Sequence, residues 1–106
     1  MPSSAMEPTY RCGPPAPGCT GRTADVLIVV RTRTVGRGDV IAYRAPERAR
    51  AQCGAGAILV HRVQRAERGR RLYVIGDNRP QSCDSRVFGS VPIGNVIGKV
   101  VGVRVR

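Results

Sequence analysis

The sequence has no tryptophan, one phenylalanine (Phe88), one histidine (His61) and one lysine (Lys99) among its 106 residues. With three tyrosines as the other aromatic residues, a core must be built from Val, Ile, Leu and Ala. Valine and isoleucine favour strands, because β-branching restricts χ1 in a way that a pleated sheet tolerates. The length and the 42% hydrophobic content predict one globular domain over residues 1–106.

Long apolar runs are also absent. The longest candidate, residues 26–30, has the length of a buried strand and is far shorter than the about 20 residues needed to span a bilayer. No signal peptide is evident. No Cys-x-x-Cys pair occurs and His61 is the only histidine, so a zinc site would need an unusual ligand set. We expect no metal and no cofactor.

Acidic residues are scarce: 7 Asp and Glu stand against 18 Lys and Arg, which gives a formal charge of +11. Such a balance suits nucleic acid or an anionic membrane surface. The alternative is that arginine simply solvates the surface, and the spread of the basic residues along the chain favours it. The densest basic run, residues 65–71, flanks a predicted hairpin turn. We therefore expect no nucleic-acid partner.

The four cysteines stand at Cys12, Cys19, Cys53 and Cys83. Cys12 and Cys19 enclose a Pro- and Gly-rich segment that cannot be a helix or a central strand, which favours a short loop closed by its own disulfide. Cys53 and Cys83 then form the second bridge, although four cysteines allow three pairings. An even number of cysteines in a small domain indicates an oxidising, extracytoplasmic setting, with four reduced thiols in the cytosol as the alternative.

Apolar alternation predicts five strands joined by Gly- and Pro-rich turns. Residues 26–30 are apolar on both faces, which predicts that both faces are covered. A helical turn at 47–52 and a polar loop at 76–89 complete the prediction. Glycines 98 and 102 predict bulges or bends in the last strand. The expected fold is all-β, a compact, strongly bent antiparallel sheet or partly closed barrel. The predicted strands are residues 23–34, 39–44, 57–66, 71–75 and 96–105.

Four segments, taken in order, resemble one family. Residues 2–9, Pro-Ser-Ser-Ala-Met-Glu-Pro-Thr, resemble the nucleophile segment of the type I signal peptidases, which are membrane-bound serine endopeptidases. Residues 38–40, Gly-Asp-Val, and 60–63, Val-His-Arg-Val, are similar to the segments around the general base of that family. Residues 76–89 resemble the bacterial Gly-Asp-Asn signature nearly position for position, and residues 91–92 and 97–100 continue the match.

The resemblance implies a set of site residues. Ala5 stands where the family has its serine nucleophile, and His61 stands where bacterial members have a lysine base and archaeal members a histidine. A neutral imidazole needs little pKa adjustment to act as a base near pH 7. The Ser3 hydroxyl and the N–H of Ala5 would bind the oxyanion. The orienting network would comprise Ser82, Asp84, Asp77 and Arg86, with either carboxylate holding the His61 ring and Arg86 paired to one of them.

Ala5 allows three explanations: an engineered inactivation, a natural pseudopeptidase, or Ser4 as a displaced nucleophile. The pseudopeptidase gains support because His61 also departs from the bacterial pattern that residues 76–89 follow. Ser4 is the weakest explanation, since neighbouring residues of an extended segment point in opposite directions. An alanine methyl group cannot attack a carbonyl, so we expect little or no peptidase activity.

The resemblance implies a signal peptidase I-like domain of the signal-peptidase and SOS-repressor peptidase fold type. Its partners would be signal peptides of exported preproteins and a membrane surface, at the outer face of the bacterial cytoplasmic membrane, with the domain monomeric. The alternative function is a non-catalytic pseudopeptidase that binds signal peptides or a membrane partner. The sequence begins at the segment that usually follows a transmembrane helix, and the large insertion subdomain of bacterial members is absent between residues 64 and 75.

Overall fold

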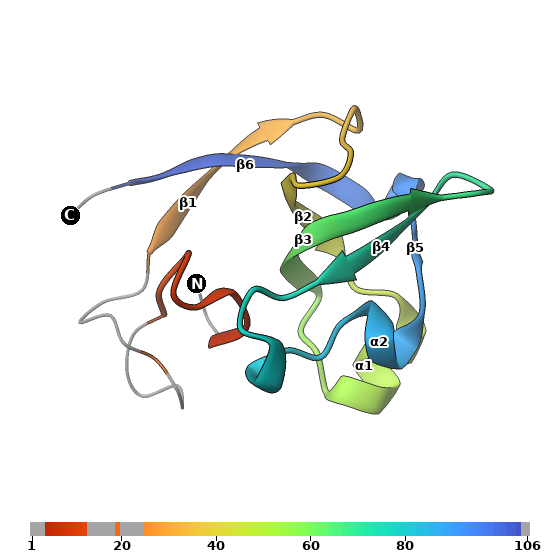
Figure 1. Cartoon of the computed structure of the whole chain (residues 1–106), viewed down its shortest axis with the longest axis horizontal. Helices are drawn as coiled ribbons and strands as arrows, with labels where there is room; N and C mark the ends of the chain where they lie inside the picture. Colours follow the sequence, from red (N-terminus) through yellow and green to blue (C-terminus); the bar gives the residue numbers. More distant parts are fainter. Residues whose placement is uncertain (1–3, 13–18, 20–24, 105–106) are drawn as a thin grey trace.

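The computed structural model describes residues 4–12, 19 and 25–104, in which six antiparallel strands form one sheet in the order β1-β6-β2-β3-β4-β5 (Figure 1). This confirms the all-β prediction. Register shifts in the β1–β6, β2–β6 and β3–β4 ladders bend the sheet. The strands are β1 (Val26–Arg31), β2 (Val40–Arg44), β3 (Ile58–Glu67), β4 (Arg71–Ile75), β5 (Val91–Pro92) and β6 (Val96–Arg104).

Short helices fill the connections between the strands. The predicted helical turn after β2 is a complete helix, α1, which ends at Gly54 in the left-handed conformation (φ 61°) that glycine adopts without steric cost. The segment 76–89, predicted as a polar loop, contains two helical turns, and α1 and α2 lie side by side below the sheet (Figure 1). The helices are η1 (Ser4–Met6), α1 (Glu47–Cys53), η2 (Arg79–Gln81), α2 (Ser85–Phe88) and η3 (Ile93–Asn95).

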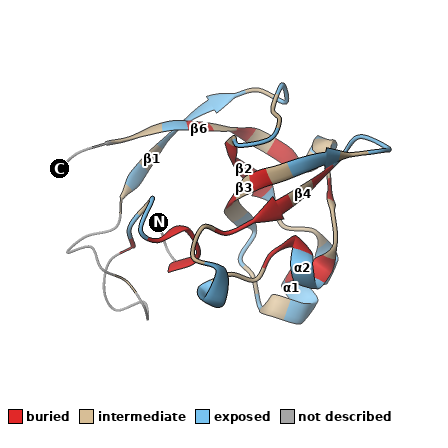
Figure 2. Cartoon of the chain, viewed as in Figure 1, coloured by how far each residue is buried: buried red, intermediate tan, exposed pale blue. Residues whose placement is uncertain are grey.

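The prediction that both faces of the first strand are covered is wrong. Within the described part of the chain β1 pairs only with β6, and the two strands extend from the body as a ribbon (Figure 2). Four of its apolar side chains are exposed: Val26, Ile28, Val29 and Val30. A continuous apolar run indicates burial on both faces only where layers pack on the strand.

The glycines of β6 mark irregular pairing, as the sequence predicts. Residue 101 is skipped between Gly102 and Val100 opposite β1, and residue 97 is skipped between Gly98 and Val96 opposite β2. A Cβ at Gly98 would collide with the carbonyl oxygen of Val30 and lie 2.7 Å from a Val29 methyl group. Glycine at this position therefore allows β1 and β6 to approach closely.

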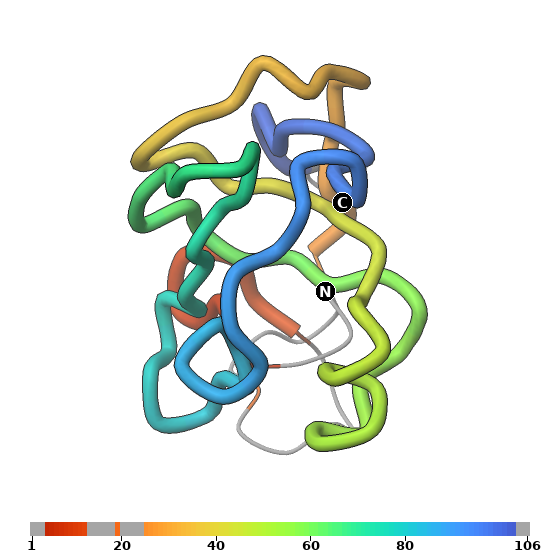
Figure 3. Tube along the Cα trace, turned by 90° about the vertical axis from the view of Figure 1, so that its right-hand side faces the viewer, coloured from red at the N-terminus to blue at the C-terminus, as the bar shows by residue number. Residues whose placement is uncertain are grey.

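Two clusters of buried side chains form the core. The larger lies between the sheet and the short helices, and the smaller joins the N-terminal segment to β2 and β6 through Met6, which is fully buried. Figure 3 shows this segment, in red, lying against the strands. The larger cluster comprises Ile41, Tyr43, Ala49, Val63, Leu72, Val74, Phe88, Val91 and Val96. Among the residues described, no helix has both the length and the apolar character needed to cross a membrane.

Candidate functional site

His61 lies in β3, where it pairs in register with Ile41 of β2 and is 2% exposed. The pleat turns His61 and Val63 toward the core, on the face that the sequence pattern assigns to both. Tyr43, two residues along β2, is fully buried, and its Oη lies 2.6 Å from Nδ1 of His61. A buried imidazole and a buried phenol thus satisfy each other.

Ser82 and Asp84 approach the imidazole from the opposite side. Ser82 Oγ lies 3.3 Å from His61 Nε2 and donates a hydrogen bond to Asp84 Oδ2 at 2.8 Å. Asp84 is fully buried, and Arg86 donates to both of its oxygens from Nε (2.8 Å) and Nη2 (2.9 Å). Asp84 therefore pairs with Arg86, and it is linked to His61 through Ser82 rather than by a direct hydrogen bond.

Asp77 occupies a different part of the site. Arg62, next to His61 in β3, donates to both Asp77 oxygens at 2.9 Å, and the Thr9 hydroxyl donates to Oδ2 at 2.6 Å. Asp77 is one of the two carboxylates that the sequence predicts to orient the imidazole or to pair with Arg86. In the structure it does neither and instead ties the N-terminal segment to β3.

The Gly-Asp-Asn turn at residues 76–78 holds the nucleophile-like segment in place. The backbone N–H of Asn78 donates to the carbonyl of Ala5 (2.8 Å), and its side-chain amide donates to the carbonyl of Ser4 (2.9 Å). The N–H of Asp77 points at the sulfur of Met6, 3.3 Å away. These contacts set the position of Ala5, which is 7% exposed, relative to the signature loop.

Gly76 allows these parts to meet. A Cβ at this position would overlap Ser82 Oγ, lie 2.5 Å from Ser82 Cβ and lie 2.7 Å from the carbonyl oxygen of Ala5. Contacts below 3 Å to a carbonyl group require the backbone to shift. Glycine therefore lets the hydroxyl of Ser82 and the backbone of Ala5 pack against the same turn.

Ala5 and His61 line one cavity of about 390 Å³. Its walls come from η1, the segment between α1 and β3, the start of β3 and the loop before Asp84. The structure thus brings the predicted nucleophile and base positions to a single hollow. The remaining lining residues are Cys53, Gly54, Ala55, Gly56, Ile58, Leu59, Val60, Gln81 and Cys83.

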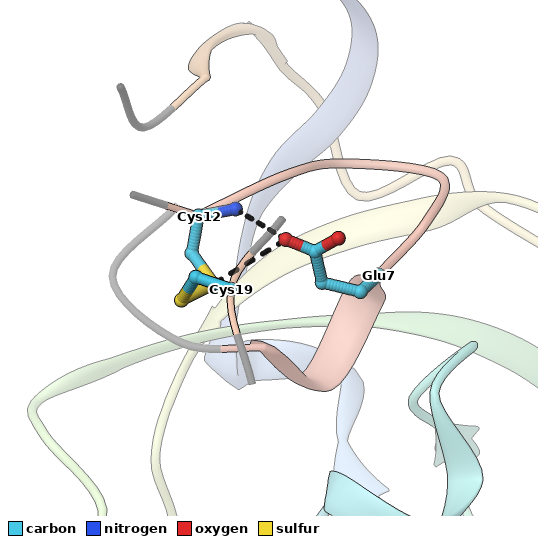
Figure 4. Close-up of side chains that lie close together, drawn as sticks. All are labelled: Glu7, Cys12 and Cys19. Atoms are coloured by element: carbon cyan, nitrogen blue, oxygen red, sulfur yellow. Dashed lines mark hydrogen bonds between the residues drawn. A yellow bond between two sulfur atoms is a disulfide. The ribbon is translucent and has the colours of Figure 1, made fainter. Parts of the chain in front are cut away.

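The cysteines pair as the sequence favours, Cys12 with Cys19 and Cys53 with Cys83. The second bridge is part of the cavity wall and joins α1 to the loop that carries Ser82. At the first bridge the N–H of Cys12 donates to Glu7 Oε2 (2.8 Å), and Figure 4 shows this carboxylate against the disulfide. Glu7, Cys12 and Cys19 bring ligand-type atoms within 4.8 Å of one another. Cysteine binds a metal as a thiolate, and the sulfur atoms of a disulfide are not thiolates.

The electrostatics of the site favour a neutral imidazole beside an ionised carboxylate. Burial lowers the pKa of His61 to about 4, with Asp84 acting against this shift and Arg86 adding to it. Burial alone would raise the pKa of Asp84, but hydrogen bonds from Arg86, the N–H of Gly76 and Ser82 outweigh it and hold this pKa below its ordinary value. Burial also raises the pKa of Tyr43, so the phenol keeps its proton.

Two residues of the site were not evident from the sequence, and one predicted residue cannot be placed. Ser3, the predicted oxyanion donor, lies outside the described residues. Tyr43 resembles an ordinary strand residue, although a buried tyrosine needs a partner for its hydroxyl group. Asn78 stands in the signature with no predicted role of its own. The preference of asparagine for turns, where its amide can bind neighbouring backbone, was the available signal.

Comparisons with known proteins match the part of the chain that contains most of these site residues. The family described as "Signal peptidase, peptidase S26" matches residues 60–104, which contain His61, Ser82, Asp84 and Arg86. Signal peptidase I of Buchnera aphidicola subsp. Baizongia pistaciae (strain Bp) is 58% identical over 31 residues, which are 29% of this chain and 10% of that protein. No solved structure matches the chain.

The likeness to this peptidase family is carried by residues 60–104, which make up less than half of the chain. This match and the similarity to signal peptidase I support membership of the chain in the type I signal peptidase family. The matched stretch spans about a tenth of the curated relative, so the relative's whole-protein activity does not carry over by similarity alone.

Proposed function

We propose that this chain is a signal peptidase-type domain that binds the extended end of a signal peptide and does not cleave it. The observation that carries the proposal is the cavity shared by Ala5 and His61. It keeps the walls of a peptide site while the position of the nucleophile holds a methyl group. A carbonyl group bound there meets no attacking oxygen.

An open strand edge supports peptide binding. β4 pairs with β3 only from Arg62 onward, so residues 58–61 have no described strand on that side. Ile58, Leu59 and Val60 line the cavity along this edge. An extended peptide can bind such an edge through main-chain hydrogen bonds, with alternate side chains entering pockets. A cavity of about 390 Å³ has room for more than one small side chain, the kind found at signal-peptide cleavage sites.

The test uses a synthetic signal peptide with an Ala-x-Ala end. We expect saturable binding in a calorimetric titration and recovery of intact peptide by mass spectrometry after prolonged incubation. Gly56 lines the cavity, and a Cβ added at this position would meet open space, so Gly56→Trp should fill the cavity and weaken binding about tenfold or more.

The matched control is Gly94→Trp, because a Cβ at Gly94 would also meet open space and this residue lies outside the cavity. Equal weakening by both variants, or no saturable binding by the unaltered protein, would refute the assignment of the cavity. Cleavage that Ser4→Ala abolishes would identify Ser4 as a displaced nucleophile and overturn the non-cleaving proposal.

A second candidate is a signal peptidase scaffold that is disabled only by Ala5. The retained Ser82–Asp84–Arg86 network favours it, because the loop next to the base position is complete. This candidate requires Ala5→Ser to recover cleavage of the same peptide. The hydrogen bonds of both His61 ring nitrogens argue against that recovery.

We also propose that the β1–β6 ribbon contacts an anionic membrane surface, as expected at the outer face of a cytoplasmic membrane. The exposed apolar side chains of β1 lie next to Arg31 and Arg33, and apolar area together with cationic groups is what interfacial binding requires. The two disulfides suit this oxidising location.

Co-sedimentation with vesicles containing anionic lipid tests the membrane contact. The double variant Ile28→Glu/Val30→Glu should reduce binding strongly, because it places charge in the apolar part of the ribbon. Val87→Glu, which alters an equally exposed apolar residue on α2, should leave binding unchanged. Unchanged binding by the ribbon variant would exclude this contact.

A further inference from the structure

Four side chains form a continuous hydrogen-bonded chain through the site. It runs from Tyr43 Oη to His61 Nδ1 (2.6 Å), from His61 Nε2 to Ser82 Oγ (3.3 Å), and from Ser82 Oγ to Asp84 Oδ2 (2.8 Å). Tyr43, His61 and Asp84 are at most 2% exposed. Each proton shared by these side chains therefore lies in one of the three contacts. The numbers of donors and acceptors decide which atom carries it.

The count begins at Asp84. The Asp84 carboxylate forms a bidentate ion pair with Arg86, and its pKa lies below the ordinary value. It is therefore ionised and can only accept hydrogen bonds. The Ser82 hydroxyl donates its single proton to Asp84. Toward His61, Ser82 can then only accept, so Nε2 must carry a hydrogen.

The count ends at Tyr43. With a pKa of about 4, His61 is neutral at pH 7 and has one ring hydrogen, which the contact with Ser82 places on Nε2. Nδ1 therefore presents a lone pair. Tyr43, protonated and 2.6 Å away, donates to it. Every donor in the chain is thus matched to one acceptor.

We infer that Tyr43 is a positioning residue that, together with Ser82, holds His61 in the Nε2–H tautomer. A general base needs an accessible lone pair. In this arrangement Nδ1 is capped by the Tyr43 hydroxyl and Nε2 is protonated, so neither nitrogen can take a proton from a hydroxyl at position 5. The His61 tautomer is therefore a second block to catalysis, besides Ala5. That this block matters for peptide cleavage rests on the proposed function.

The tautomer is measured without any peptide, so its outcome is independent of peptide binding. In ¹⁵N-histidine-labelled protein, long-range ¹H–¹⁵N correlation spectra between pH 6 and 8 should show His61, the only histidine, with a protonated Nε2 and an unprotonated, hydrogen-bonded Nδ1. A protonated Nδ1, a mixture of tautomers, or an imidazolium at pH 7 would overturn the inference.

Tyr43→Phe tests the role of the hydroxyl while preserving the packed ring. It should shift the Nδ1 resonance to the position of a nitrogen without a hydrogen-bond donor. Tyr73→Phe is the control, because Tyr73 lies in β4 with Arg65 over its ring, 4.0 Å away. An unchanged Nδ1 resonance in Tyr43→Phe would show that Tyr43 only fills space.

Ala5→Ser supplies a test by activity. Since the variant adds an oxygen but no free base, signal-peptide cleavage should remain at the background of the unaltered protein. Cleavage well above background would overturn the block at His61 while leaving peptide binding by the domain unaffected.

Discussion

Replacing Asp84 by alanine is expected to destabilise the fold by about 3 kcal/mol, the low end of the cost of removing one member of a buried ion pair. Asp84 is fully buried and accepts from Ser82, from Arg86, and from the backbone N–H groups of Gly76 and Arg86. The variant leaves these donors unmatched at the junction of β4 and α2. Arg86 is 37% exposed and can regain water, which limits the loss.

Urea denaturation followed by circular dichroism measures this effect as a change in the free energy of unfolding. Asp39→Ala is the matched control, because Asp39 forms an ion pair with Lys99 at the surface, 3.2 Å away, with both partners partly exposed. A surface pair contributes about 0–1 kcal/mol. If both variants lose the same small amount, Asp84 does not anchor the loop.

Acid should destabilise the protein through His61 in a defined window. Burial lowers the pKa of His61 from 6.5 to about 4, so between these values the unfolded chain binds a proton that the folded protein does not. Stability therefore falls as the pH is lowered from 6.5 to 4, by about 3 kcal/mol at 1.36 kcal/mol per unit. Above pH 6.5 the imidazole is neutral in both states and contributes no slope.

Denaturant titrations at pH 7, 5.5 and 4.5 test this dependence. His61→Gln removes the titrating group, so the difference between the slopes of the two proteins isolates the contribution of His61. Lost pairing of Asp84 adds a decline at lower pH, because its pKa is also depressed. Parallel pH profiles for the two proteins would contradict the buried, neutral imidazole.

The fold was predictable where local patterns decide it. The hairpin of β3 and β4 follows from two alternating runs around a Gly-containing turn, and β4 occupies the predicted residues. The exposure of β1 was not predictable, because an apolar run does not reveal whether another layer covers it. The helical turn α2 within residues 76–89 likewise depends on a side-chain cap, the Asp84 carboxylate that accepts from the N–H of Arg86.

The site was predictable in its positions and less so in its connections. The resemblance placed Ala5, His61 and Ser82 at family positions; the structure brings the three side chains together, and their roles remain predictions. It could not choose between Asp77 and Asp84, since that choice depends on which arginine each carboxylate faces. Tyr43 reaches the imidazole only through the pairing of β2 with β3, and such register is a property of the folded sheet.

We propose that this signal peptidase-type domain binds signal peptides without cutting them. One measurement addresses it directly: equilibrium titration of a synthetic signal peptide, followed by mass spectrometry of the same sample. We expect saturable binding that Gly56→Trp weakens, with the peptide recovered intact. Peptide cut at its Ala-x-Ala site by the unaltered protein, or absence of binding, would contradict it.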